Sequence, residues 1–124
     1  MPNTGMMMNT RDIGAVAEER AADFLQEHGY VIVARNWRYK NLGEIDIIAM
    51  DGQTIVFVEV RYRSSRSYGL PELSVTKAKL RTIRKTATLW MMQHGALNAP
   101  CRVDVIGTDM MGGSVEFRHY KNVW

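Results

Sequence analysis

The chain has 124 residues, of which 46% are hydrophobic and 23% are charged, as in an ordinary globular protein with one domain. Its one cysteine, Cys101, excludes an internal disulfide, and its three histidines lack the cysteine partners of a structural zinc site. No apolar run reaches the roughly 18 residues of a membrane-spanning helix, and the start of the chain lacks a signal-peptide pattern. We therefore expect a protein of the reducing cytoplasm with no membrane partner.

A flexible leader and one helix are expected at the start of the chain. The helix is predicted from Asp12, its N-cap, to about His28, because apolar residues recur at helical spacing and Gly29 ends the run. The residues before it carry no core-forming pattern. The expected division is a leader over residues 1–11, a single domain over 12–120 and a tail over 121–124.

Three antiparallel strands are predicted next, since strongly apolar runs are separated by turn residues. Their expected ranges are residues 30–38, 43–50 and 53–63. Asp51 and Gly52, a common pair in tight hairpins, are expected to form the turn between the second and third strands. A second helix is predicted from Ser74, its N-cap, to about His94.

Two later segments, 101–108 and 115–120, alternate as strands do, the second being an edge strand or a tail. The order α-β-β-β-α-β(-β) predicts an α/β domain. Its mixed sheet would have four or five strands and be flanked by helices.

Two carboxylates, Asp46 and Glu59, lie in the middle of apolar strands. An ionised carboxylate buried among isoleucines and valines costs several kcal/mol unless a partner compensates its charge. With Asp46 opposite Phe57 in the hairpin, the two acids would lie diagonally on one face, close enough to share a divalent cation. Arg61, two residues after Glu59, would project from the same face.

An inert salt bridge is the alternative for these acids, with Asp46 bound to Arg61 or Glu59 to Arg38. The acids on this face, with Glu44 included, outnumber the bases that follow them, which favours an external cation.

Glu18 is a further candidate, from the first helix. At 100° per residue it falls beside Ala21 and Leu25, at the border of the apolar face. A surface charge near a helix N-terminus, where acids are favoured, is an equally good interpretation of this residue.

Positive charge is concentrated in one segment, although the net charge is only +3. Residues 61–85 hold eight Lys or Arg and one acid, which gives +7 there and leaves −4 elsewhere. Such a segment is typical of proteins that bind polyanions, because each neutralised phosphate releases counterions; a solvated basic helix is the alternative. The candidate nucleic-acid-binding residues are Arg63, Arg66, Lys77, Arg81, Arg84 and Lys85.

The chain resembles the YraN family of bacterial proteins over residues 14–107. The motifs that carry the resemblance are, in order, GAVAEERAADFLQEHGY, ARNWR, GEIDIIAMDG, FVEVRYR, SVTKAKLR and CRVDVIG. Members of that family look like restriction-endonuclease-type nucleases and, distantly, like archaeal Holliday junction resolvases. The resemblance implies a restriction-endonuclease-like core with a PD-(D/E)xK site. Glu18, Asp46, Glu59 and Arg61 would surround Mg²⁺ or Mn²⁺, held by Asp46 and Glu59.

Arg61 departs from the wider nuclease pattern, which has lysine there, and Ile45 stands where that pattern has proline. A guanidinium stays protonated and is a poor general base, but it could orient water or stabilise charge on the phosphate. The leading hypothesis is a metal-dependent endonuclease-like protein acting on DNA, branched DNA included, with a homodimer suggested by analogy with resolvases. The alternatives are a catalytically inactive nucleic-acid-binding module with the same fold and a protein-interaction subunit.

Overall fold

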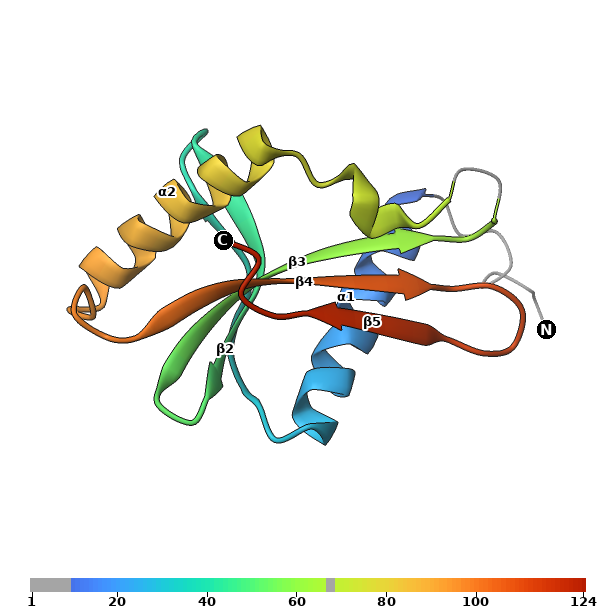
Figure 1. Ribbon diagram of the computed structural model, residues 1–124, viewed down its shortest axis with the longest axis horizontal. Coiled ribbons are helices and arrows are strands. Elements are labelled where there is room, and N and C mark those ends of the chain that lie inside the picture. The colour runs from blue at the N-terminus through green and yellow to red at the C-terminus, as the bar shows by residue number, and fades with distance from the viewer. Residues whose placement is uncertain (1–9, 67–68) are drawn as a thin grey trace.

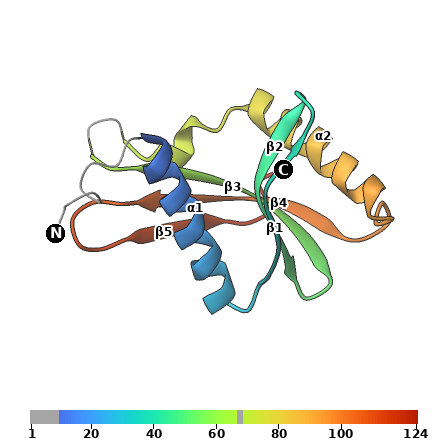
Figure 2. The same ribbon diagram turned by 180° about the vertical axis from the view of Figure 1, so that it is seen from behind.

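The computed structural model describes residues 10–66 and 69–124. A five-stranded sheet carries one helix on each face (Figures 1 and 2). The elements are α1 (Thr10–Glu27), β1 (Val31–Tyr39), β2 (Gly43–Asp51), β3 (Thr54–Arg63), the 3-10 helix η2 (Pro71–Ser74), α2 (Lys77–Gln93), β4 (Cys101–Asp109) and β5 (Glu116–Tyr120). This order confirms the predicted α/β arrangement, and the last segment is a strand.

The strands lie side by side in chain order, from β1 to β5. β3 and β4 are parallel, and the other neighbours are antiparallel. Parallel neighbours need a crossover connection, which α2 provides between β3 and β4. The sheet is therefore mixed, with β3 at its centre.

Helix α1 begins at Thr10, two residues before the predicted N-cap, Asp12. Most of the expected leader, residues 1–9, lies outside the described residues. The predicted apolar face is confirmed, since Ala17, Ala21 and Leu25 are fully buried against the sheet. Gly29, at φ +89°, follows the helix end in the left-handed conformation that favours glycine.

The β2–β3 hairpin differs from its predicted register by two residues. Its turn consists of Gly52 and Gln53, so that Asp51 pairs with Thr54 and Ile48 with Phe57. A glycine at φ +61° in the first turn position suits a type II′ turn. A shift by two residues leaves every side chain on its expected face, because the strand period is two.

Helix α2 begins later than predicted. Thr76 rather than Ser74 is its N-cap, and the Thr76 side chain accepts a hydrogen bond from the backbone N–H of Lys79 at 3.1 Å. Pro71 begins a separate short helix, η2, and Ser74 is the last residue of that helix. The apolar stripe of α2 is buried against the face of the sheet opposite α1.

Gly43, at the start of β2, lies where the hairpin of β1 and β2 approaches α2. A side chain there would overlap Thr82 and Thr86, so only glycine permits this contact. Among the described residues, neither helix is long and apolar enough to cross a membrane.

Candidate functional site

The sheet splits between the antiparallel strands β2 and β3. Pairing of β2 with β3 ends at Ile47 and Val58, whereas β2 stays paired with β1, and β3 with β4, to their far ends. Figure 1 shows the two arms diverging beyond this point. We call the space between residues 43–46 of β2 and 59–63 of β3 the fork.

Three carboxyl groups from three elements meet in the fork. Oδ2 of Asp46 accepts a hydrogen bond of 2.8 Å from the backbone N–H of Val60, which links the strands where their ladder has ended. Glu59 is buried, and Glu18 reaches the same place from α1. A cleft of about 470 Å³ is lined by Glu18, Asp46, Glu59, Val60, Arg61, Tyr62, Pro71, Ser74 and Lys79.

Burial and the neighbouring acid change the ionisation of Glu18 and Glu59. Burial, followed by the charge of Asp46, raises the pKa of Glu59 to about 7. Burial and the charge of Asp46, with hydrogen bonding to it, raise the pKa of Glu18 to about 7. Where these acids are ionised they repel one another, and a bound cation would relieve this repulsion.

Two bases approach Glu59. Arg61 forms an ion pair with it, with 3.0 Å between Nη2 and Oε2, and Nζ of Lys79 lies 4.0 Å from the same oxygen. Arg38 pairs with Glu44 at 3.4 Å, so the salt bridge considered between Arg38 and Glu59 is not formed.

The structure thus brings together all four residues predicted for the site, Glu18, Asp46, Glu59 and Arg61. It also adds Lys79, which the sequence analysis did not single out. The sequence shows that this residue is a lysine and that it lies in the basic segment. Its place in the fork depends on how α2 crosses the sheet. Helical spacing in the sequence gives no information about that crossing.

The donor set fits a hard divalent cation such as Mg²⁺ or Mn²⁺, which prefers carboxylate oxygens. Within residues 10–66 and 69–124, no three His, Cys, Asp or Glu side chains form a ready-made metal cage. A cation would accordingly take two ligands, Asp46 and Glu59, and complete its shell with water and substrate oxygens. Mg²⁺ commonly binds in this way, through one or two carboxylates.

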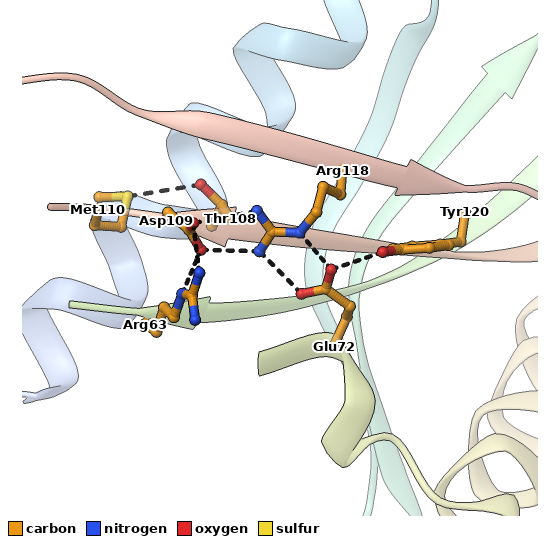
Figure 3. Close-up of polar contacts among 7 residues, drawn as sticks. All are labelled: Arg63, Glu72, Thr108, Asp109, Met110, Arg118 and Tyr120. Atoms are coloured by element: carbon orange, nitrogen blue, oxygen red, sulfur yellow. Dashed lines mark hydrogen bonds and ion pairs between the residues drawn. The ribbon is translucent and has the colours of Figure 1, made fainter. Parts of the chain in front are cut away.

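Arg63 occupies a different position from that expected of a phosphate-binding residue. Its guanidinium donates two hydrogen bonds to Asp109, at 2.7 and 2.9 Å, and its side chain is only 13% exposed. Figure 3 shows that Asp109 also accepts hydrogen bonds from Arg118, which in turn donates to Glu72. The hydroxyl of Tyr120 donates to Glu72 as well. Arg63 is therefore committed to this ion-pair network.

The network fastens η2 to the edge of the sheet. Glu72 of η2 lies over Gly107, where any side chain would overlap its carboxylate. Burial opposes ionisation of Glu72, but hydrogen bonds from Arg118 and Tyr120 outweigh it and lower the pKa of this acid. Since η2 ends at Ser74, which lines the cleft, the network also fixes one wall of the fork.

The other candidate nucleic-acid-binding residues lie on the surface. Arg84 stacks on the ring of Trp124, at 5.0 Å from the ring centroid. Every one of these candidates is exposed, namely Arg66, Lys77, Arg81, Arg84 and Lys85. These side chains are accessible to a phosphate group. Their role in binding nucleic acid stays a prediction.

Comparison with known proteins identifies the family. The sequence pattern of the Uncharacterised protein family UPF0102 matches residues 17–108. The chain belongs to this family. A UPF0102 protein of Geobacter metallireducens is 41% identical over 119 residues, covering 96% of this chain and 97% of the relative. One from Symbiobacterium thermophilum is 46% identical over 97 residues, covering 78% and 81%.

Another UPF0102 protein, from Carboxydothermus hydrogenoformans, is 37% identical over 116 residues, covering 94% of this chain and 98% of the relative. The resemblance to the YraN family is thereby confirmed. The family match reaches from α1 through most of β4 and so includes every residue that lines the fork.

Proposed function

We propose that this chain is a metal-dependent endonuclease-like protein that binds DNA and hydrolyses its phosphodiester bonds. The observation that carries the proposal is the meeting of Glu18, Asp46 and Glu59 from three different elements in one open cleft. Grouped carboxylates of raised pKa are costly to fold, and functional sites are where such costs are commonly found. A purely structural cluster would be expected to be fully paired, as the network around Asp109 is.

Asp46 and Glu59 would hold Mg²⁺ or Mn²⁺, with Glu18 assisting directly or through water. When bound, the cation would supply a water of lowered pKa and offset the charge that develops on the phosphate. Other residues of the chain would orient the two metal-binding carboxylates. The Val60 amide fixes Asp46, and Arg61 fixes Glu59, so both carboxylates face the cleft in defined positions.

DNA is the proposed substrate because α2 brings Lys79 to the fork and also carries four exposed bases, Lys77, Arg81, Arg84 and Lys85. Such side chains bind the phosphate backbone and do not read sequence. A reducing, cytoplasmic setting belongs to the proposal, since Cys101 has no second cysteine to pair with. So does a homodimer, which would present two sites to two strands.

A catalytically inactive DNA-binding module is the second candidate. The observation that favours it is the ion pair of Arg61 with Glu59, which places an always-protonated group where the wider nuclease pattern has lysine. Such a module would keep the fold and the basic surface and would bind DNA without cutting it.

One experiment separates the two candidates. Purified protein is incubated with plasmid, single-stranded and four-way-junction DNA in Mg²⁺, Mn²⁺ or a chelator, beside Asp46→Asn. Cleavage that needs the metal and Asp46 is the expected result. Salt-sensitive binding with no cleavage in any metal would favour the inactive module, and cleavage that survives chelation or the substitution would exclude this site.

A further inference from the structure

Lys79 is the one lysine that lines the cleft among the described residues. It is the third residue of α2, and the hydrogen bond from its backbone N–H to Thr76 fixes the first turn of the helix. Its side chain is 36% exposed, and its ammonium lies 4.0 Å from Oε2 of Glu59. The ammonium therefore stands beside the carboxylates and keeps access to solvent.

Arg61, by contrast, is already engaged with the protein. Nη2 contacts Glu59 at 3.0 Å, and Nη1 donates to the hydroxyl of Ser74 at 3.3 Å. Nε is buried and has no hydrogen-bond partner among the described residues. Two guanidinium nitrogens thus contact the protein and the third is buried, so the side chain, although 29% exposed, braces Glu59 against η2.

We propose that Lys79 is the catalytic cation of this site and that Arg61 is a positioning residue. This inference rests on the proposed nuclease function. Position 61 lacks the lysine of the wider nuclease pattern, and α2 supplies one from 18 residues further along the chain. The ammonium would contact a non-bridging oxygen of the scissile phosphate, which lysine binds as a compact point charge.

Hydrolysis of the phosphodiester bond does not require Lys79 to donate or accept a proton. A water oxygen forms a bond to phosphorus as the bond from phosphorus to the leaving sugar oxygen breaks. The water proton passes to solvent, and the leaving oxygen takes a proton from solvent. Lys79 remains an ammonium throughout and stabilises the negative charge that builds up on the non-bridging oxygens.

The test compares Lys79→Ala with wild type in single-turnover cleavage of duplex DNA in Mn²⁺ and in DNA binding in Ca²⁺. Removal of one such donor typically lowers a rate on the order of 100-fold or more, so we expect that loss with a change in Kd of less than about threefold. Lys121→Ala is the matched control, because this exposed lysine lies just beyond β5 and does not line the fork.

Chemical rescue distinguishes a missing amine from a disturbed fold. Lys79→Cys is made together with Cys101→Ser, so that the chain has a single thiol, and is alkylated with 2-bromoethylamine to restore an ammonium at almost the original length. We expect cleavage to increase at least about tenfold on alkylation while the unfolding midpoint stays unchanged. Unalkylated protein treated in parallel provides the baseline.

Two outcomes would overturn the inference in different ways. If wild type cuts and Lys79→Ala cuts within about threefold of it, or if alkylation restores nothing, Lys79 is not catalytic although the nuclease proposal stands. If wild type cuts no DNA in any metal, the nuclease proposal fails and the role of Lys79 fails with it.

Discussion

The backbone N–H of Val60 donates a hydrogen bond of 2.8 Å to Oδ2 of Asp46, across the point where β2 and β3 cease to pair. The carboxylate of Asp46 accepts this bond in place of a backbone carbonyl of the neighbouring strand. It thereby fixes the separation of β2 and β3 at the fork. The same carboxylate is hydrogen-bonded to Glu18 and Glu59, and a cation would take the place of the protons in those contacts.

Asp46→Asn tests this double role. The amide oxygen can still accept the bond from Val60, so we expect the fold to persist while metal binding and cleavage are lost. Wild type should gain about 2.7 kcal/mol at a Mn²⁺ concentration 100 times its Kd, and the variant almost none. Thermal unfolding with Mn²⁺ and with a chelator measures the difference, and equal gains in both proteins would contradict the assigned ligand.

The raised pKa values of Glu18 and Glu59 predict a dependence of stability on pH in the absence of metal. Between about pH 4.5 and 7 the folded chain holds more protons on these groups than the unfolded chain, so the free energy of unfolding falls as pH rises through that window. We expect a loss of about 1–2 kcal/mol, which allows for solvent screening of the half-exposed Glu18.

Thermal unfolding in a chelator at pH 5 and pH 8 measures this effect. Asp46→Asn serves as the comparison, since removal of the neighbouring charge should reduce the fall. A midpoint that rises from pH 5 to pH 8 in the wild-type protein would refute the prediction.

Much of the fold could be predicted from the sequence, because apolar periodicity is a local property. The buried stripe of Ala17, Ala21 and Leu25 follows from helical spacing alone, and the acids of β2 and β3 kept their predicted face. That face was correct even though the hairpin register was shifted by two residues. The turn type that sets the register depends on a glycine backbone angle that the residue order does not fix.

The parts that were missed depend on contacts between distant segments. Arg63 finds Asp109, 46 residues later, only because β3 and β4 are parallel neighbours. Lys79 enters the fork only because α2 crosses over the sheet at that point. Neither relationship has a periodic signal in the sequence.

Arg118→Ala should destabilise the protein, because it leaves Glu72 and Asp109 without one of their cations. The expected loss is about 3 kcal/mol in the free energy of unfolding, as for other largely buried ion pairs that lose one partner. Urea denaturation measures it, with the exposed Arg20→Ala as a control that should stay within about 0.5 kcal/mol. Equal stability of the two variants would show that the network contributes little.

Gly43→Ala should disturb the contact of the β1–β2 hairpin with α2. The added methyl group would overlap Thr82 and Thr86, and overpacking of this kind costs about 1–3 kcal/mol. Gly113→Ala is a suitable control, since nothing lies within 4 Å of the new carbon. Thermal midpoints compare the two, and an unaffected Gly43→Ala would mean that the hairpin moves away from the helix at no cost.

Arg81→Ala and Lys85→Ala test the basic surface of α2. If each side chain contacts one phosphate, each substitution should reduce the slope of log Kobs against log salt concentration by about 1. Fluorescence anisotropy with duplex DNA at several NaCl concentrations measures the slope. Lys121→Ala should leave it unchanged, and an unchanged slope in the α2 variants would place the DNA elsewhere.

The parallel pairing of β3 with β4 has a consequence for synthesis of the protein. Residues 55–63 of β3 each pair with one that lies 46 positions later, so this edge of the central strand lacks a neighbour until β4 has left the ribosome. A nascent chain that ends before Cys101 contains Glu18, Asp46, Glu59 and Lys79 but not the strand that completes the sheet around them. We therefore expect the acids to assemble late, after most of the polypeptide has been made.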